Sequence, residues 1–411
     1  MNILFIHPAF PGQFLYLASY LGRNPDNKVY FLAEENSLGG DLKGVKVGLY
    51  KGPTDEEVQA MNGMGPASVL GQAWLKGRNI LRSLDYLDRK EHFRPDIIIG
   101  HTGWGSLMYL KDFYPDVPVL GYFEWYYRSD NSDGFWWPDE KADIAARVHN
   151  RTKNAPLWLS FETCDQGLVP TKWQYDQFPA EIQQKLHIIH EGTDNDFCSP
   201  LPERPGLELH NENCDLVLPK GTEILTYLSR GFEPYRGFHE FMDAMRIVLN
   251  TRPNTHVVIA GTDRVCYGAK TDGPSHKEQE LEKGGFDESR VHWVGNLNRG
   301  DYQKMLRSSC CHVYLTRPFI LSWSMLEAMS FGLPIVVSKT PPCEEVVKHD
   351  VNGLLADFRS PYHIAQKIIE LLSDREKAER LGKAARETIL EKYALIKCLK
   401  KQEDLIYSMV R

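Results

Sequence analysis

Two arginines stand where an apolar run ends, and their spacing suits the binding of a phosphate-rich anion. Arg230 and Arg236 follow the run at 224–229, and Gly237 then opens a pattern of helical period. In open α/β sheets, ligands bind beyond the carboxyl ends of the strands. Two guanidinium groups at such a place could hold a diphosphate and stabilise charge on a leaving phosphate. Two exposed surface arginines are the plainer interpretation of the same pattern.

A second stretch, residues 317–334, is typical of a loop followed by a helix N-terminus and a glycine stop. The start of a helix presents free backbone N–H groups and the positive end of the helix dipole, which favour an anion. The residues expected to offer these groups are Ile320, Leu321, Ser322 and Trp323. Glu327 lies about one turn into the helix, where it could accept hydrogen bonds from sugar hydroxyls beside a phosphate. A surface carboxylate within a helix is the alternative.

The first half of the chain offers fewer candidates. Gly12 follows the apolar run at 2–7, and its missing side chain would let the backbone approach a phosphate or sugar closely, although a simple turn is the alternative. His101 ends another apolar run, and Glu124 and Tyr126 follow a third. We expect these three side chains to face an acceptor, with the tyrosine ring as a stacking surface for sugars. A structural histidine and plain aromatic core are the competing interpretations.

The order of these motifs resembles glycosyltransferase family 4, the retaining enzymes that use nucleotide sugars. The likeness covers most of residues 190–357 and rests on the segments 190–200, 229–237, 257–261, 291–296, 317–334, 341–347 and 352–355. The resemblance implies that Arg230 and Arg236 contact the donor diphosphate and that Glu327 holds the ribose. It also implies that Gly261 and Asn296 belong to donor-binding loops.

Two departures from the family pattern affect this assignment. Arg236 stands where the family has a lysine, and its spacing from Arg230 is one residue longer. Both groups are cations, so the clamp on the diphosphate is kept. Phe319 stands where the family has the first of two glutamates, which usually touches the transferred sugar. The choice of sugar is therefore less predictable than the use of a nucleotide sugar.

The family implies an α/β fold of the GT-B type, with two Rossmann-like domains and an interdomain cleft. The expected reaction transfers a hexose-type sugar from a nucleoside-diphosphate sugar to a glycan, glycolipid or small-molecule acceptor, as in polysaccharide biosynthesis. We expect no cofactor and no metal, because the arginines would take the place of a cation. One alternative is a nucleotide-sugar epimerase of the same fold. Another, motivated by Phe319, is a catalytically weakened protein that binds a carbohydrate or nucleotide.

Short apolar runs alternate with helical patterns, which indicates parallel sheets built from crossover units. The proline-bearing run at 199–220 interrupts this rhythm and is interpreted as an interdomain linker with local turns. We expect an acceptor domain at 1–200, a donor domain at 201–380 and a C-terminal helix at 381–411 that crosses back to the first domain. The predicted strands are 2–7, 29–32, 96–100, 117–122, 185–190, 223–229, 255–260, 290–294, 311–315, 334–337 and 353–356, and the predicted helices include 67–91, 237–251, 301–308 and 361–373.

Composition limits the class of protein. The chain has 411 residues, 42% of them hydrophobic and 25% charged, which fits a globular protein of two or more domains. The net charge of -7 argues against a nucleic-acid partner. We expect neither a transmembrane run nor a signal peptide, and the eight cysteines without a C-x-x-C pair predict a reduced, cytoplasmic protein. Lysines beside leucines in the C-terminal tail leave peripheral contact with the inner membrane face open.

Overall fold

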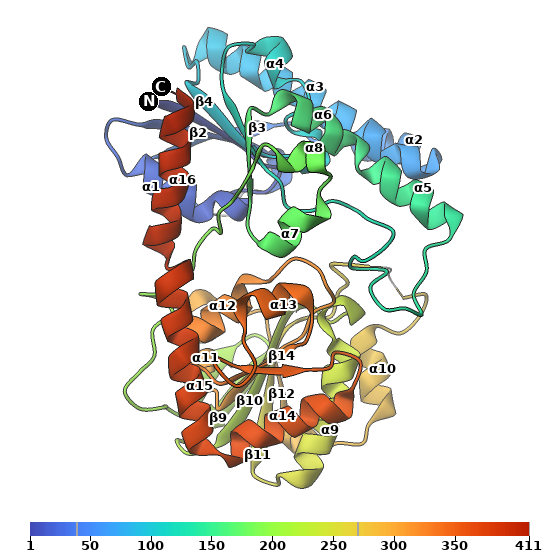
Figure 1. Ribbon diagram of the computed structural model, residues 1–411, viewed down its shortest axis with the longest axis vertical. Coiled ribbons are helices and arrows are strands. Elements are labelled where there is room, and N and C mark those ends of the chain that lie inside the picture. The colour runs from blue at the N-terminus through green and yellow to red at the C-terminus, as the bar shows by residue number, and fades with distance from the viewer. Residues whose placement is uncertain (38–39, 269–270, 411) are drawn as a thin grey trace. The chain divides into compact units, whose positions relative to one another are not determined.

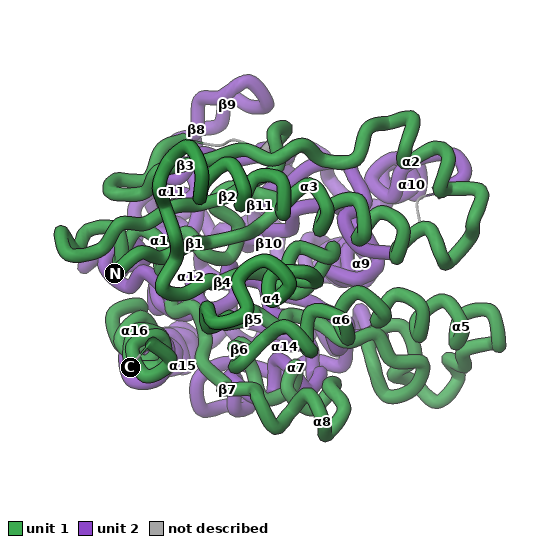
Figure 2. Tube along the Cα trace, turned by 90° about the horizontal axis from the view of Figure 1, so that it is seen from above, with its two compact units in different colours: residues 1–192, 395–411 green, residues 193–394 purple. Residues whose placement is uncertain are grey.

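The computed structural model describes residues 1–37, 40–268 and 271–410, and these divide into two compact units. Unit 1 comprises residues 1–192 together with the segment that starts at Leu395, and unit 2 comprises Thr193–Ala394 (Figure 2). Each unit has a hydrophobic core around a parallel sheet of its own.

Unit 1 is built on a seven-stranded parallel sheet with the order β3-β2-β1-β4-β5-β6-β7. The chain runs outward in one direction from β1 to β3 and in the other direction from β4 to β7. This reversal makes β1 and β4 neighbours, so their carboxyl ends frame the place where doubly wound sheets bind ligands. The strands are β1 (Asn2–Ile6), β2 (Lys28–Glu34), β3 (Val45–Tyr50), β4 (Ile97–His101), β5 (Val119–Tyr122), β6 (Gln166–Val169) and β7 (Leu186–Ile188).

The side chains of β1 point alternately to the two faces of this sheet. Ile3 and Phe5 pack with α1 (Leu15–Gly22) on one face, and Leu4 and Ile6 pack with α3 (Ser68–Lys90) on the other. Because both faces are covered, the strand is apolar from Ile3 to Ile6. The other helices of this unit before its C-terminal segment are η1 (Gly12–Phe14), η2 (Glu35–Ser37), α2 (Asp55–Asn62), η3 (Gly65–Ala67), η4 (Gly103–Gly105), α4 (Leu110–Phe113), α5 (Ile144–Lys153), α6 (Ala155–Thr163), α7 (Lys172–Gln177) and α8 (Ala180–Gln183).

The last helix, α16 (Leu395–Val410), belongs to unit 1, although the chain enters it from unit 2 (Figure 1). It packs beside α1 and contacts β4. Leu399 and Ile406 are buried in the same cluster as Ile3 and Phe5. Gln402 Nε2 donates a hydrogen bond of 3.0 Å to a main-chain carbonyl at residue 190. The helix therefore completes one face of the first sheet.

Unit 2 contains a six-stranded parallel sheet with the order β12-β11-β10-β13-β14-β15. Here the reversal lies between β10 and β13, which are neighbours in the sheet. The strands are β10 (Glu223–Gly231), β11 (Thr255–Thr262), β12 (Val291–Gly295), β13 (Cys311–Tyr314), β14 (Ile335–Ser338) and β15 (Leu354–Ala356).

Helices cover both faces of the second sheet. The core on one face includes buried residues of α11 (Arg299–Ser308) and α12 (Trp323–Ser330). On the other face, α9 (Phe238–Thr251) packs against α14 (Pro361–Ser373), which also contacts β13, β14 and β15. The remaining helices of this unit are η5 (Pro234–Arg236), α10 (His276–Lys283), η6 (Glu288–Arg290), α13 (Pro341–Val346), α15 (Arg375–Thr388) and the π-helical turn η7 (Ile389–Tyr393).

The structure corrects the interpretation of the proline-bearing run. Most of the stretch at 199–220 is not a linker with local turns, because β8 (Leu207–Asn211) and β9 (Cys214–Leu218) form an antiparallel hairpin within it. Four buried leucines that alternate with exposed residues join the core of unit 2, namely Leu207, Leu209, Leu216 and Leu218. All the predicted strands are present with small shifts at their ends, whereas β3 and β6 were not anticipated.

Within the three described ranges, no helix is both long and apolar enough to cross a membrane. All eight cysteines lie in the described ranges, and none of them forms a disulfide.

Candidate functional site

Arg230 and Arg236 both lie near the strand reversal of unit 2, but in different surroundings. Arg230 is exposed, and its carbonyl oxygen accepts hydrogen bonds from Thr262 Oγ1 at 2.9 Å and from Arg264 Nε at 3.2 Å. These bonds fix the backbone and leave the guanidinium of Arg230 at the surface. Arg236 ends η5 and is only 7% exposed. Of the two predicted cations, Arg230 therefore lies at the surface and Arg236 is buried.

Neutral oxygen atoms hold the guanidinium of Arg236. Its Nη1 donates to Tyr314 Oη at 2.9 Å, to Thr316 Oγ1 at 2.8 Å and to the Ile320 carbonyl at 3.1 Å. A guanidinium carries five N–H donors. The N–H groups on Nε and Nη2 donate to no residue in the part of the chain that the structure describes. These groups stay available for a ligand.

The charge of Arg236 has no direct counter-ion. Outside the five residues left undescribed, no carboxylate lies within ion-pair distance of it. Glu233 acts on it through space, but Glu233 Oε2 accepts the N–H of Tyr267 at 2.8 Å and that of Cys266. Burial raises the pKa of Glu233, although these hydrogen bonds oppose the shift. A buried cation without a partner is costly, so this arrangement suits an anionic ligand.

Aromatic rings surround the same guanidinium. Its central carbon lies 5.3 Å from the ring centroid of Tyr267, 5.9 Å from that of Tyr314 and 6.0 Å from that of Phe319. Phe319 is buried and meets Tyr235 and Tyr267 edge to face, with centroid distances of 5.5 Å and 5.0 Å. The position where the family pattern has a glutamate is therefore part of an aromatic wall, which compensates the cation only in part.

The predicted helix N-terminus is present as α12, with Ser322 as its N-cap. The N–H of Ser322 donates to Tyr314 Oη at 2.8 Å, so it is already engaged, contrary to the expectation that the N–H groups at 320–323 are free for a ligand. Ile320 turns its carbonyl toward the arginine, Leu321 packs partly against the core, and Trp323 is the first helical residue.

Glu327 lies in α12 and is half-buried. Its Oε2 accepts a hydrogen bond of 2.6 Å from Tyr302 Oη. Burial raises the pKa of Glu327, while the hydrogen bond from Tyr302 and the charge of Arg299 oppose that shift. The other carboxylate oxygen accepts no hydrogen bond from the described residues, so it can accept one from a ligand hydroxyl.

Gly261 and Asn296 lie at the carboxyl ends of β11 and β12. Gly261 has φ +135°, and a Cβ there would lie 1.9 Å from the carbonyl oxygen of Ser229. Close packing of β10 against β11 is therefore enough to require a glycine at this position, and no bound ligand is needed to account for it. Asn296 is exposed, and its role in donor binding stays a prediction.

A polar cluster occupies the strand reversal of unit 1. His7 follows β1, His101 ends β4, and Glu124 follows β5. His101 Nε2 lies 3.4 Å from Glu124 Oε2, and Gln13 Nε2 donates to Glu124 Oε1 at 2.7 Å. The rings of His7 and His101 meet edge to face with centroids 5.4 Å apart. The structure thus brings together the two predicted residues His101 and Glu124. It places His7 and Gln13 in the same cluster.

Burial sets the protonation of this cluster. It lowers the pKa of His7 to about 4, and the charge of His101 acts in the same direction. Burial alone would raise the pKa of Glu124, but hydrogen bonding and charge from His101, together with Gln13, outweigh it and the pKa is lowered. At neutral pH the cluster therefore combines an uncharged His7 with an ionised Glu124.

Gly12 belongs to the same region for a steric reason. It has φ +52°, and a Cβ there would lie 2.5 Å from the His7 ring. Glycine therefore lets η1 pack closely on His7, whereas its contact with a phosphate or sugar stays a prediction.

A cavity of about 310 Å³ opens beside the polar cluster. It is lined from α3, from the segments after β4 and β5, and from the junction of α5 with α6. His101 and Glu124 line it, but Tyr126 does not, because its ring packs against Phe178 with centroids 5.9 Å apart. Trp104, Trp125 and Tyr127 provide the aromatic lining instead.

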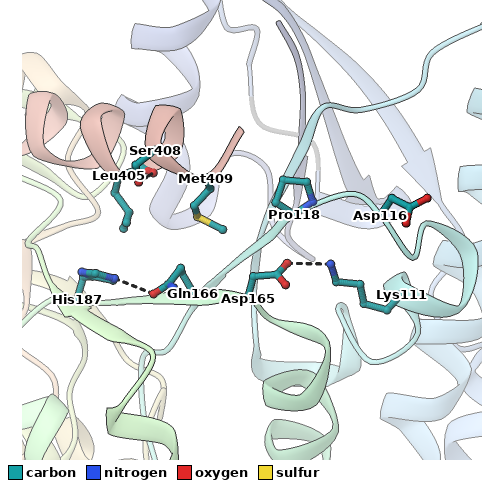
Figure 3. A pocket seen from close by; sticks show the side chains of 9 residues that line it. All are labelled: Lys111, Asp116, Pro118, Asp165, Gln166, His187, Leu405, Ser408 and Met409. Carbon is teal, nitrogen blue, oxygen red and sulfur yellow. Dashed lines mark hydrogen bonds and ion pairs between the residues drawn. The ribbon is translucent and has the colours of Figure 1, made fainter. Parts of the chain in front are cut away.

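A second hollow of about 430 Å³ lies near the amino ends of β5 and β6 and includes side chains of α16 (Figure 3). Four of its polar side chains form two pairs. Lys111 Nζ lies 2.9 Å from Asp165 Oδ2, and His187 Nε2 lies 2.8 Å from Gln166 Oε1. The hollow therefore offers few unsatisfied groups to a ligand. Elsewhere in the described ranges, no three histidine, cysteine, aspartate or glutamate side chains are arranged to hold a metal ion.

Solved structures share this architecture along the whole chain. Sucrose-phosphate synthase from Thermosynechococcus elongatus has a TM-score of 0.69 at 16% identity, over 99% of this chain and 98% of that one. HepE from Anabaena, solved in complex with UDP-glucose, has a TM-score of 0.69 at 14% identity, over 99% of this chain and 100% of that one. The two parallel Rossmann-like sheets, of seven and six strands, therefore define a GT-B fold.

Sequence comparisons narrow this class to a family. The pattern of the glycosyl transferase family 4 group matches residues 25–198, and that of glycosyl transferases group 1 matches residues 212–388. The chain belongs to glycosyltransferase family 4. Among curated proteins, spore coat protein SA of Bacillus subtilis is 24% identical over 51% of this chain and 55% of that protein. The chain thus spans about half the length of this curated relative.

The sequence did not single out four polar residues of the two sites, His7, Gln13, Tyr314 and Thr316. His7, Tyr314 and Thr316 lie at or just beyond the carboxyl end of a strand next to the reversal. That position was the signal that could have found them.

Proposed function

We propose that the chain is a retaining hexosyltransferase that moves a sugar from a nucleoside-diphosphate donor to a hydroxyl acceptor. The observation that carries the proposal is the buried guanidinium of Arg236, which has available N–H donors and no carboxylate partner among the described residues. A diphosphate supplies the missing negative charge and accepts those hydrogen bonds. Membership of glycosyltransferase family 4 gives this anion site its chemical context.

Unit 2 is the proposed donor unit. Arg230 contributes a second cation from the surface of the unit. Glu327 accepts a hydrogen bond from the ribose through its available carboxylate oxygen. Gly261 and Asn296 lie along the same sheet edge and would line the donor. Because HepE was solved with UDP-glucose, a uridine nucleotide is the first donor to test.

The proposed chemistry needs no protein nucleophile. The bond between the anomeric carbon and the diphosphate oxygen breaks, and the acceptor oxygen bonds to the same face of that carbon. The electron pair of the broken bond goes to the diphosphate, whose charge Arg236 and Arg230 stabilise. The leaving phosphate oxygen takes the proton of the acceptor hydroxyl. The products are the glycosylated acceptor and the nucleoside diphosphate.

The cavity of unit 1 is the proposed acceptor site. Glu124 is ionised at neutral pH and can accept hydrogen bonds from acceptor hydroxyls beside His101. Trp125 and Tyr127 offer ring faces to a sugar or another small group. The acceptor is accordingly a small molecule or the end of a glycan or glycolipid.

Product analysis tests the proposed function. The purified chain is incubated with UDP-sugars and a panel of hydroxyl acceptors, and the products are analysed by mass spectrometry and NMR. We expect a product that keeps the anomeric configuration of the donor. Arg236→Met should abolish it, whereas Arg375→Met should not, because the side chain of Arg375 is 91% exposed and pairs with Glu379. A product with inverted configuration, an epimerised donor, or nucleotide binding without transfer would each contradict the proposal.

We also propose a reducing, cytoplasmic location. None of the eight cysteines, all of which lie in the described ranges, forms a disulfide. Burial raises the pKa of the Cys343 thiol to about 11, which keeps it protonated and unreactive. Such thiols fit a compartment that does not form disulfides. Recovery of the chain with intramolecular disulfides from an oxidising compartment would contradict this location.

A further inference from the structure

One cation in the unit 1 cavity has no partner of opposite charge. Lys153 ends α5, is half-buried and lines the cavity. Its Nζ lies 3.5 Å from the ring centroid of Tyr127. Across the described ranges it forms neither an ion pair nor a hydrogen bond through its side chain. Burial lowers the pKa of Lys153, and Asp133 opposes that shift from beyond ion-pair distance.

The other charged groups of the cavity are already engaged. Lys76 Nζ lies 2.9 Å from Glu34 Oε2, and both side chains are mostly buried. Glu124 has His101 at 3.4 Å and a hydrogen bond from Gln13. Lys153 is thus the uncompensated charge among the lining residues. A cation–π contact does not replace the hydration that an ammonium loses on burial.

We propose that the acceptor carries an anionic group, a phosphate or a carboxylate, and that Lys153 binds this group while Glu124 binds acceptor hydroxyls. The inference rests on the proposed function, since it takes the cavity to be the acceptor site. An anion would give the half-buried ammonium its missing partner, whereas a neutral acceptor would leave it desolvated and unpaired. The Lys153 ammonium lacks a partner, and the Glu124 carboxylate, although engaged, has lone pairs that can accept further hydrogen bonds. The cavity is therefore complementary to a molecule that has both an anion and hydroxyl groups.

The size of the cavity limits how much of the acceptor it holds. A volume of about 310 Å³ is at the lower end of ligand pockets in proteins. It admits a group of about the size of one sugar ring with its anion. A longer acceptor would place its charged end here and the rest outside.

Competitive acylation tests the proposal on the whole 411-residue chain. Acetic anhydride reacts with unprotonated amines, and mass spectrometry measures the rate at each lysine. The probes are glycerol, glycerol 3-phosphate and glycerate, which separate a phosphate source from a carboxylate source. We expect at least one anionic probe to raise the pKa of Lys153 by about one unit and slow its acylation about tenfold. Glycerol should have no such effect.

Lys28 is the internal control in the same digest. It also stacks over an aromatic ring, with its Nζ 5.4 Å from the Phe93 centroid, but it is exposed and does not line the cavity. Its acylation rate should not respond to any probe. If glycerol protects Lys153 as well as its charged analogues do, or if no probe protects it, the proposal is wrong.

Steady-state transfer assays give a second readout. Lys153→Gln should raise the KM for an anionic acceptor about tenfold, as expected for the loss of about 1.4 kcal/mol of charge-assisted binding, and should leave the KM for a neutral acceptor nearly unchanged. Lys28→Gln should behave as the wild type. A Lys153→Gln variant that keeps the wild-type preference for the anion would overturn the proposal.

Calorimetry of UDP binding to the same wild-type preparation reports separately on the proposed function. If UDP binds and the acceptor site shows no preference for an anion, only the inference about the acceptor fails. If UDP and the other nucleoside diphosphates do not bind, the proposed function fails, whatever the acylation result.

Discussion

At the residue scale, the two candidate arginines differ most in how far solvent reaches them. Arg230 is exposed, so water and salt weaken its attraction for an anion. Arg236 is 7% exposed and is held by neutral oxygens, in surroundings where a charge-assisted hydrogen bond is stronger. We therefore expect donor binding to depend more on Arg236 than on Arg230.

The protonation of His7 makes the stability of unit 1 depend on pH. The native pKa is about 4, while the unfolded chain titrates near 6.5, so the unfolded state binds more protons between these values. Stability therefore rises with pH across this window and is lost as pH falls through it. We expect His7→Gln to remove on the order of 3 kcal/mol of the loss seen in the wild type between pH 6.5 and 4.

Urea unfolding at pH 7 and pH 4.5, read by hydrogen exchange of the β1 and β4 amides, measures this effect. His210→Gln is the control, because His210 is exposed and its pKa is raised by hydrogen bonds to Glu208 and Asp215. An equal acid sensitivity of wild type and His7→Gln would contradict the role given to burial of His7.

The sequence located candidate side chains at strand ends more reliably than it located their directions. His101 and Glu124 were predicted and do meet in the structure. Tyr126 was predicted beside them, but it packs into the core while Trp125 and Tyr127 line the cavity. These residues lie in an irregular segment after β5, where no periodic pattern sets which way a side chain points. Lys153 was missed because it comes from a distant helix.

At the scale of elements, Gly237 controls the entry from η5 into α9. It has φ +61°, and a Cβ there would lie 2.7 Å from Leu315 Cβ. Gly237→Ala adds backbone strain and a steric clash next to Arg236, so we expect it to cost about 1–3 kcal/mol of stability and to weaken nucleotide binding. Urea unfolding and UDP titration measure the two effects.

Gly221→Ala separates strain from displacement of the site. Gly221 also has a positive φ, +95°, but a Cβ there would meet no atom within 4 Å. This variant should lose stability through strain while binding UDP normally. If Gly237→Ala also binds UDP normally, the turn does not position Arg236 as described.

The elements themselves were predictable where a strand is mostly buried and mainly apolar. β1, β10 and β13 have this character and were expected from their mainly apolar runs. β3 was missed because it is an edge strand with mostly half-exposed residues. β6 was missed because its apolar run is only two residues long, Leu168 and Val169. The β8–β9 hairpin was missed because nearby prolines masked the alternation of its leucines.

At the scale of the whole molecule, the chain returns to its first unit through α16. Ile406 is fully buried in the cluster that contains Ile3 and Phe5, whereas Ile396 on the same helix is 60% exposed. We expect Ile406→Ala to destabilise unit 1 by about 2–5 kcal/mol and Ile396→Ala to change stability by less than about 0.5 kcal/mol.

Hydrogen exchange resolves where this loss occurs. In Ile406→Ala, the amides of β1 and β4 should exchange faster, while those of β10 and β13 should keep their wild-type rates. Equal acceleration in both sheets would show that α16 does not stabilise unit 1 in particular.

Both units place their candidate groups at the reversal of strand order. In unit 1 this edge holds His7, His101 and Glu124, and in unit 2 it holds Arg236 with its hydroxyl partners. The repeated architecture explains why the candidate side chains of both units lie at strand ends. The architecture does not by itself show which unit binds the donor and which binds the acceptor. That assignment comes from the charged side chains at each sheet edge.

Calorimetric titration of UDP into wild type, Arg236→Met and Arg375→Met measures directly whether the buried guanidinium of Arg236 binds the donor diphosphate. We expect UDP to bind wild type and Arg375→Met with the same affinity. Arg236→Met should bind it about 10- to 100-fold more weakly, because hydrogen bonds to a charged group contribute about 1.5–3 kcal/mol. Wild-type affinity in Arg236→Met would contradict the assignment of the buried cation to the donor diphosphate.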